Sequence, residues 1–191
     1  GSWVTALYQA MAQQPVEIIL CAHNFAVTKT ERREIGDTVY WAFPTAEGAS
    51  ALKKVLDAEQ PELVQVFGTE NDHPVWALET FDPEKVLIYI QGLAGPCGEH
   101  MADGLPERFL RRQPLKETVT ARFGGATVYQ LRQRLLDQGE AEKKVFALAR
   151  NVLGRTEWDK AFTASVNPQA RYYKLNEILR APFYSGGWQR D

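Results

Sequence analysis

The pattern of apolar and polar residues over the first sixty positions predicts a helix, two strands and a second helix. Helices are expected at about Val4–Gln13 and at Thr45–Gln60, where apolar residues recur at helical spacing. The apolar and β-branched stretches Val16–Thr30 and Thr38–Phe43 are typical of strands, and the polar segment Lys29–Asp37 connects them. We therefore expect the fold to open with two antiparallel strands.

The middle of the chain is predicted to consist of short strands separated by turns. Strands are expected at Leu63–Phe67, Val75–Thr80 and Val86–Gln91, because turn-forming residues bound short apolar runs there. The segment Gly92–Gly104 holds too many glycines for regular structure, and we predict a loop that carries function. A short helix is expected at Leu105–Arg112.

The last third of the chain shows helical spacing and helix-capping residues. A strand of alternating character, Leu115–Phe123, leads into it and ends at the glycine pair Gly124-Gly125. The helices expected after this pair are Thr127–Gln138, Glu140–Leu153, Thr156–Ser165 and Pro168–Leu179. The whole pattern predicts an α/β protein of the α+β type, with a small mixed sheet followed by a helical layer over about residues 127–191.

Length and composition favour a single domain. The chain has 191 residues, of which 45% are hydrophobic and 24% charged, enough for one well-buried core. We interpret Gly1-Ser2 as a cloning remnant and expect one domain over residues 3–191.

No stretch reaches the roughly 18 apolar residues of a membrane span, and Cys21 and Cys97 lack the neighbours of a zinc site. We expect a cytoplasmic protein with reduced thiols, for which a partner could provide a place at the inner face of the inner membrane.

The charges are distributed unevenly along the chain, although the net charge is only −2. The segment 57–107 holds eleven acidic residues against Lys85 alone, and the segment 108–134 holds seven basic residues against Glu117 alone. A phosphate-ester enzyme could use such a division, with cations holding the phosphates and carboxylates holding a metal. The alternative is that the two segments neutralise each other on a solvated surface.

The segment 116–134 has the layout of an anion site, with a strand, two glycines and a helix in succession. Gly124 and Gly125 allow a tight turn and a close approach to a ligand, and the first amides of the following helix lack partners. A phosphate can supply the missing acceptor. Thr127 and Gln130 also fit a capping box, in which case the Thr127 hydroxyl closes the helix on itself.

This segment resembles the ParB/sulfiredoxin superfamily over about twenty residues. Phe123-Gly124-Gly125, between a strand and a helix, is similar to the nucleotide-binding Phe-Gly-Gly turn of sulfiredoxins, and Arg122 with the next helix is similar to the equivalent turn of ParB-type proteins. Sulfiredoxins continue with Cys-His-Arg, whereas this chain continues Ala126-Thr127-Val128, so their sulfur nucleophile is missing. The Gly-Glu-Arg-Arg motif of ParB proteins is also missing. Only the nucleotide cradle is carried over.

The size of the chain and its order of elements are similar to those of plasmid fertility-inhibition proteins of this superfamily. The resemblance implies ATP binding and hydrolysis together with DNA cleavage, directed against a competing plasmid or T-DNA that is transferred through a type IV secretion system. The residues it implies for the nucleotide are Arg122, Gly124, Gly125, Ala126 and Thr127. The alternative is a non-catalytic protein that inhibits a conjugation or secretion component by contact through its acidic face.

A second candidate site is the polar segment 68–74, in which Glu70, Asp72 and His73 are candidate catalytic residues. Carboxylate oxygens suit Mg²⁺ or Mn²⁺, which can activate water for attack on a phosphodiester, so Glu70 and Asp72 are the predicted metal ligands. The alternative is a polar turn formed by Asn71 and Asp72.

Three basic residues upstream of the glycine pair are candidates for nucleic-acid contacts. Arg111, Arg112 and Lys116 could bind DNA phosphates, for which the arginine fork offers bidentate geometry. The alternative is a solvated basic helix end.

Overall fold

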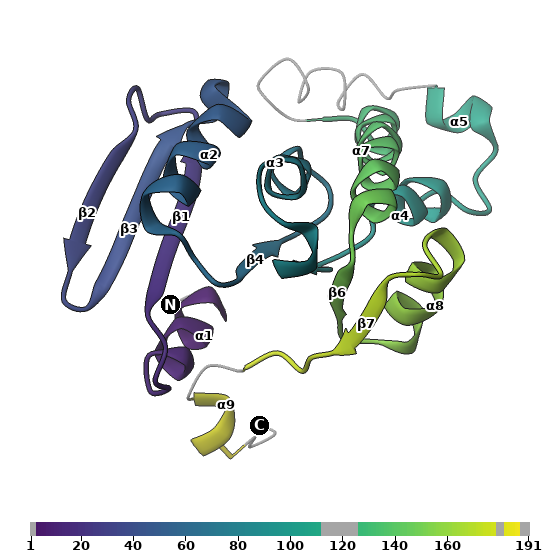
Figure 1. Ribbon diagram of the computed structural model, residues 1–191. Helices are drawn as coiled ribbons and strands as arrows, with labels where there is room; N and C mark the ends of the chain where they lie inside the picture. Colours follow the sequence, from purple (N-terminus) through teal and green to yellow (C-terminus); the bar gives the residue numbers. More distant parts are fainter. Residues whose placement is uncertain (1–2, 112–125, 179–181, 188–191) are drawn as a thin grey trace. The chain divides into compact units, whose positions relative to one another are not determined.

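The computed structural model describes residues 3–111, 126–178 and 182–187, and it confirms a mixed fold of the α+β class (Figure 1). The chain divides into two compact units, one of residues 1–61 and 174–191 and the other of residues 62–173. That division concerns packing, and the single domain over residues 3–191 stays a prediction. Each unit is described by itself.

The first unit is built from a three-stranded sheet and helices. Its elements are α1 (Trp3–Met11), β1 (Ile18–Asn24), β2 (Glu31–Ile35), β3 (Thr38–Pro44), the 3-10 helix η1 (Thr45–Glu47), α2 (Gly48–Glu59) and α9 (Pro182–Ser185). The helix α2 packs against β3, and Phe43 is buried together with Ala51, Val55 and Leu56 of α2. Both α1 and α2 lie where helical spacing predicts them.

The strand arrangement of this sheet differs from the prediction. The strands lie in the order β1-β3-β2, with β1 parallel and β2 antiparallel to β3, so the expected antiparallel pair of Val16–Thr30 and Thr38–Phe43 is wrong. The segment expected to be a connection, Lys29–Asp37, contains the edge strand β2. Its sequence, Glu-Arg-Arg-Glu-Ile, is mostly exposed and charged, which suits an edge strand and gives no apolar alternation to detect.

One carboxylate joins three elements of this unit. The Oε1 atom of Glu59 accepts hydrogen bonds from Arg32 Nε at 2.6 Å and from Trp41 Nε1 at 2.8 Å. These two bonds, the Arg32 bond first, lower the pKa of Glu59 below its ordinary value of 4.5. A carboxyl group whose pKa is lowered by folding stabilises the folded state above its ordinary pKa, and this contribution is lost as the pH falls through the folded pKa.

We therefore expect Glu59→Gln to reduce the acid sensitivity of the protein. The urea midpoint of the wild type should exceed that of the variant at neutral pH, and the difference should shrink as the pH falls below about 4. Asp57→Asn, which removes an exposed carboxylate paired with Lys53 one turn away, serves as the control. A difference between wild type and Glu59→Gln that is constant with pH would contradict this assignment.

The second unit is a βαβ arrangement around a four-stranded sheet. Its elements are β4 (Val64–Phe67), α3 (His73–Thr80), the 3-10 helix η2 (Pro83–Lys85), β5 (Val86–Tyr89), α4 (Ala94–His100), α5 (Glu107–Arg111), α7 (Val128–Leu148), β6 (Asn151–Gly154), α8 (Glu157–Val166) and β7 (Arg171–Lys174). The strands lie in the order β4-β5-β6-β7, and β4, β5 and β6 are parallel. The core is formed by β6, by Val86, Ile88 and Tyr89 of β5, and by the inner face of α7.

Three predictions for the middle of the chain are corrected by this unit. The expected strand Val75–Thr80 is the helix α3, which begins at His73-Pro74, a start position that favours proline. The expected loop Gly92–Gly104 contains α4, whose glycines serve helix packing and not a turn. The two helices expected on either side of Gly139 are one continuous helix, α7.

The C-terminal third is also less helical than predicted. The end of the expected helix Glu140–Leu153 is the strand β6, and most of the expected helix Pro168–Leu179 is occupied by β7 and the residues after it. β6 is buried at all four positions, and a short apolar run of this kind cannot be told from a buried helix by its pattern. The sequence of β7, Arg-Tyr-Tyr-Lys, is rich in residues that favour strands.

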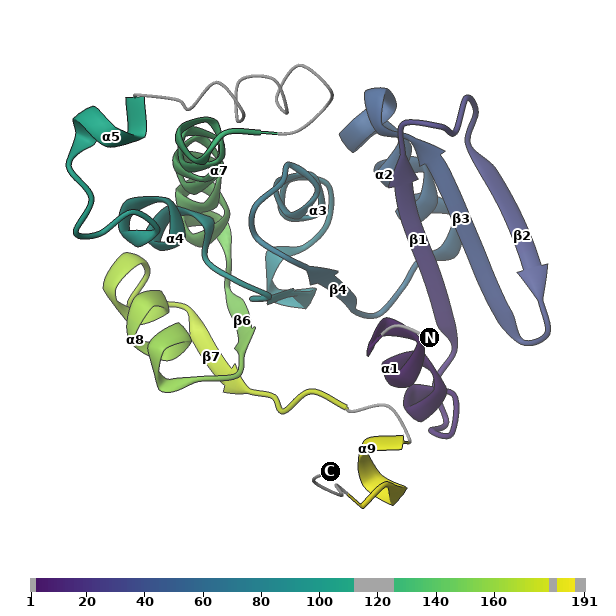
Figure 2. The same cartoon turned by 180° about the vertical axis from the view of Figure 1, so that it is seen from behind.

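The helices α4 and α7 pack side by side, as Figures 1 and 2 show from opposite sides, and their backbones are in close contact. A Cβ atom added to Gly139 would lie 2.4 Å from the Cα atom of Gly95, and one added to Gly98 would lie 2.9 Å from the backbone nitrogen of Leu136. Only glycine fits at these positions, because both neighbours are backbone atoms that cannot rotate away.

The expected strand Leu115–Phe123 lies outside the described residues. None of the helices in the described ranges is both long and apolar enough to cross a membrane.

Candidate functional site

The residues that follow β4 and β5 form a pocket with the helices α4 and α7. This carboxyl-edge pocket has a volume of about 270 Å³, and it is lined by Glu70, Gln91, Gly92, Leu93, Ala94, Cys97, Leu135 and Gln138. Open parallel sheets bind their ligands at the carboxyl ends of the strands, where loops and helix starts converge. The pocket lies at this end of the sheet and includes Glu70, one of the predicted catalytic residues.

Glu70 is held in the pocket by the backbone directly before it. Gly68 continues the β4 ladder by donating to the carbonyl of Tyr89 at 2.9 Å, and it then turns with a φ of 88°. The carboxylate of Glu70 folds back over this turn, where its Oε2 atom accepts the Thr69 N–H at 2.8 Å. A Cβ atom on Gly68 would lie 2.7 Å from the same oxygen, so the glycine is needed both for its φ and for the approach of Glu70.

A buried carboxyl group on α7, that of Glu142, supports the pocket. Glu142 is 1% exposed, and its Oε1 atom accepts the hydroxyl of Thr69 at 2.5 Å. Its Oε2 atom accepts the N–H of Gly95 at 2.9 Å. The two oxygens therefore join the segment that carries Glu70 to the start of α4, and both segments line the pocket.

Sequence reasoning missed Glu142, although the sequence contains a signal for it. Glu142 lies on the same helical face as Gly139, Val145, Phe146 and Ala149, all of which are buried. A charged residue within a buried stripe requires partners in the core, because an unpaired buried charge is costly. The stripe was overlooked because the helix was expected to break at Gly139.

The other two predicted catalytic residues are placed differently from Glu70. Asp72 is exposed at the N-cap of α3, without a side-chain cap bond, and it is not among the residues that line the pocket. The imidazole of His73 contacts the strand that precedes the segment. Its Nε2 atom lies 2.9 Å from the carbonyl oxygen of Phe67, the last residue of β4. The structure thus brings Glu70 alone of the three to the pocket.

The predicted nucleotide cradle is described only at its helical end. Thr127 is buried and forms the capping box with Gln130, in which each side chain accepts the other's backbone N–H at 3.1 Å. The Thr127 hydroxyl and amide are therefore engaged in closing α7. Ala126 is exposed directly before it. Arg122, Gly124 and Gly125 lie outside the described residues.

Of the three residues predicted to contact nucleic acid, Arg111 is described. Its guanidinium lies 5.9 Å from the centre of the Tyr129 ring, a cation–π contact between α5 and α7. Arg112 and Lys116 lie outside the described residues.

Some acidic residues of segment 57–107 form ion pairs with basic residues elsewhere in the chain. Glu79 pairs with Lys144, Glu84 with Arg171, and Asp57 with Lys53. Within the described residues, none of these partners belongs to the basic segment 108–134. These pairs neutralise only part of the acidic segment, and they are exposed and individually weak.

The residues that line the pocket include one carboxylate and two side-chain amides. Mg²⁺ is commonly bound by one or two carboxylates with water and substrate oxygens as its remaining ligands, and the pocket supplies the Glu70 carboxylate and the amides of Gln91 and Gln138. No Lys or Arg is among the lining residues, so the described part of the site does not by itself fit a polyphosphate. Among the described residues, no three His, Cys, Asp or Glu side chains form a metal-binding group.

Comparison of the chain with protein-family models, with curated proteins and with solved structures finds no significant match.

Proposed function

We propose that this chain is a metal-assisted phosphodiesterase that acts on DNA and serves as a plasmid fertility-inhibition factor, blocking transfer of a competing plasmid or T-DNA through a type IV secretion system. The observation that carries the proposal is the Glu70 carboxylate in the carboxyl-edge pocket, where parallel α/β sheets place their ligand sites. The biological role is supported by the resemblance of residues 116–134 to the ParB/sulfiredoxin superfamily.

The residues around the pocket have distinct tasks in this proposal. Glu70 holds Mg²⁺ or Mn²⁺, and the Thr69 N–H fixes the orientation of its carboxylate. Glu142 is a positioning residue, because its carboxylate accepts a hydrogen bond from the hydroxyl of Thr69, the residue next to Glu70. A bound divalent ion supplies charge stabilisation for a phosphoryl oxygen and an activated water. The side-chain amides of Gln91 and Gln138 can donate to the oxygens of a phosphodiester at the same pocket.

The ATP-binding part of the proposal rests on the sequence of residues 122–127. Among these, Thr127 is occupied by its capping box, so a phosphate there would be held by Arg122 and by the backbone amides around Gly124 and Gly125. ATP turnover is therefore expected to respond to Gly125→Trp, and unchanged turnover in that variant would remove this segment from the nucleotide site.

The DNase proposal is tested by comparing Glu70→Gln with wild type in a plasmid-nicking assay with Mg²⁺ or Mn²⁺. Glutamine keeps an oxygen that accepts the Thr69 N–H but removes the charge, so we expect nicking to fall by about 100-fold or more with little change in melting temperature. Glu62→Gln is the matched control, since Glu62 is exposed just before β4, at the opposite end of that strand from Glu70, and it should leave nicking unchanged.

Equal nicking by the Glu70→Gln and Glu62→Gln variants would contradict the proposal. A conjugation assay on the same variants then addresses the alternative. If both variants inhibit plasmid transfer as well as the wild type does, inhibition proceeds without hydrolysis, through contact with a component of the transfer machinery.

A further inference from the structure

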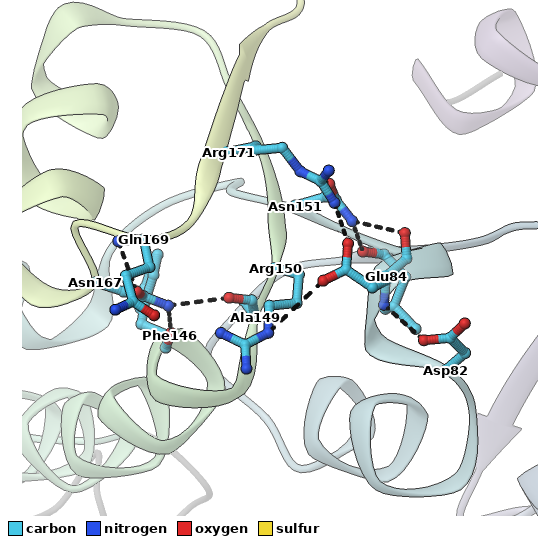
Figure 3. Close-up of polar contacts among 10 residues, drawn as sticks. Asp82, Glu84, Phe146, Ala149, Arg150, Asn151, Asn167, Gln169 and Arg171 are labelled. Atoms are coloured by element: carbon cyan, nitrogen blue, oxygen red, sulfur yellow. Dashed lines mark hydrogen bonds and ion pairs between the residues drawn. The ribbon is translucent and has the colours of Figure 1, made fainter.

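A second pocket lies at the opposite edge of the sheet in the second unit. This amino-edge pocket has a volume of about 410 Å³ and is lined by Glu84, Arg150, Gln169 and Arg171. Glu84 precedes β5, Arg150 precedes β6, and Arg171 is the first residue of β7. Figure 3 shows the two arginine side chains approaching Glu84, Arg171 from the start of β7 and Arg150 from the residue directly before β6.

Arg171 is held in place by a buried amide. Its Nε atom donates to Oδ1 of Asn151 at 3.0 Å, and Asn151 is only 3% exposed. The Nδ2 atom of Asn151 in turn donates to the backbone carbonyl of Glu84 at 2.9 Å, and the Arg171 guanidinium also binds the Glu84 carboxylate (Figure 3). A buried side chain that fixes an arginine head group in this way preorganises it for a ligand.

Arg150 gives the pocket an excess of positive charge. Its Nε atom lies 3.9 Å from Oε1 of Glu84, which is within the range of an ion pair but too long for a hydrogen bond. One carboxylate therefore faces two guanidinium groups, and the net charge of the lining residues is +1. The two terminal nitrogens of the Arg150 guanidinium, Nη1 and Nη2, can donate hydrogen bonds to an anion.

The C-terminal end of α7 adjoins this pocket. The negative end of α7 is directly before Arg150, but two of its last carbonyls, those of Phe146 and Ala149, accept hydrogen bonds from Nδ2 of Asn167 at 2.8 and 3.0 Å. The Oδ1 atom of Asn167 accepts the backbone N–H of Gln169, which fixes the backbone that carries the fourth lining residue (Figure 3).

We propose that the amino-edge pocket is a binding site for a phosphate group, held bidentately by Arg150 and assisted by Arg171 and Gln169. Planar guanidinium forks match the oxygens of phosphates, and the excess charge favours an anion over a neutral ligand. Glu84 is the internal competitor, because it occupies part of the Arg171 fork and repels the incoming anion. The site requires neither the carboxyl-edge pocket nor catalysis, so it stands independently of the proposed DNase function.

Binding to the full-length protein is measured with two probes, inorganic phosphate and a short single-stranded DNA, by following the backbone amide signals of Arg150, Asn151 and Arg171. Arg150→Gln should weaken phosphate binding by about tenfold or more. Glu84→Gln keeps an acceptor for Arg171 but removes the competing charge, so it should tighten binding severalfold. Glu79→Gln, which removes an exposed carboxylate paired with Lys144, is the control and should change neither.

Arg150→Gln should lower the affinity for phosphate and Glu84→Gln should raise it. In a charge network that serves only stability, both substitutions would lower stability without these opposite effects on affinity. The proposal is overturned if the wild type binds neither probe at this edge, if Arg150→Gln leaves the affinity for phosphate unchanged, or if Glu84→Gln weakens it. Parallel changes with both probes assign the site to the DNA backbone, and changes with phosphate alone assign it to a small phosphorylated ligand.

Discussion

Gly139→Ala is expected to lower the free energy of unfolding by about 2–3 kcal/mol, because it forces α4 and α7 apart. The new Cβ atom would lie 2.4 Å from Cα and 3.0 Å from the nitrogen of Gly95, which no change of rotamer can relieve. Alanine gains about 1 kcal/mol in helix propensity over glycine, but the overpacking is larger. The separation also lengthens the hydrogen bond from Gly95 to Glu142, now 2.9 Å.

Gly92→Ala is the matched control for this experiment. Gly92 lines the same region, but a Cβ atom added to it meets nothing within 4 Å, and its φ is not in the left-handed region. We expect the free energy of unfolding of this variant, measured by urea denaturation, to stay within about 0.5 kcal/mol of the wild-type value. A Gly139→Ala variant as stable as the wild type would show that the two helices are not in backbone contact.

Replacement of Glu142 should have effects of very different size depending on the new residue. Glu142→Ala removes the acceptor for the Thr69 hydroxyl and for the Gly95 N–H and leaves a cavity in the core, so we expect a loss of about 3 kcal/mol. Glu142→Gln should cost less than about 1 kcal/mol. Its oxygen can accept from Gly95 and its amide can donate to Thr69, whose hydroxyl then turns to the Gly92 carbonyl, 3.2 Å away.

The urea midpoints of these two variants separate two roles for the carboxyl group. If glutamine costs as much as alanine, the charge of Glu142 and not its hydrogen-bonding geometry holds the pocket together. If alanine costs nothing, Glu142 does not join the segment that carries Glu70 to α4, and its role as a positioning residue is wrong.

The sequence predicts the elements with strong local patterns. α2 and α8 have helical apolar spacing with end signals, and β4 and β5 are short apolar runs between turns, so their types and approximate bounds are confirmed. The class of the fold, α+β, follows from these elements. The predicted direction of β1 relative to β3 was wrong, because a third strand, β2, lies between them in the chain. β2 carries no apolar pattern from which it could be predicted.

The candidate site is only partly readable from the sequence, because its residues come together through tertiary contacts. Glu70 was predicted for its chemistry, and its position after a strand placed it correctly at the sheet edge. Asp72 and His73 were predicted because they are close to Glu70 in the chain. In the structure Asp72 is the N-cap residue of α3, and the His73 imidazole contacts the carbonyl of Phe67. Glu142 lies more than seventy residues from its partner Thr69, and nothing local in the sequence links the two.

The most direct test of the proposed site is a Mn²⁺ titration of isotope-labelled full-length protein, followed by the loss of amide signals near the paramagnetic ion. If Glu70 holds a divalent metal in the carboxyl-edge pocket, the signals of Glu70 and Gly92 should broaden first, those of Arg150 and Arg171 at the opposite edge should persist, and Glu70→Gln should remove the effect. Broadening that is unchanged in Glu70→Gln, or that is centred elsewhere in the chain, would contradict the site.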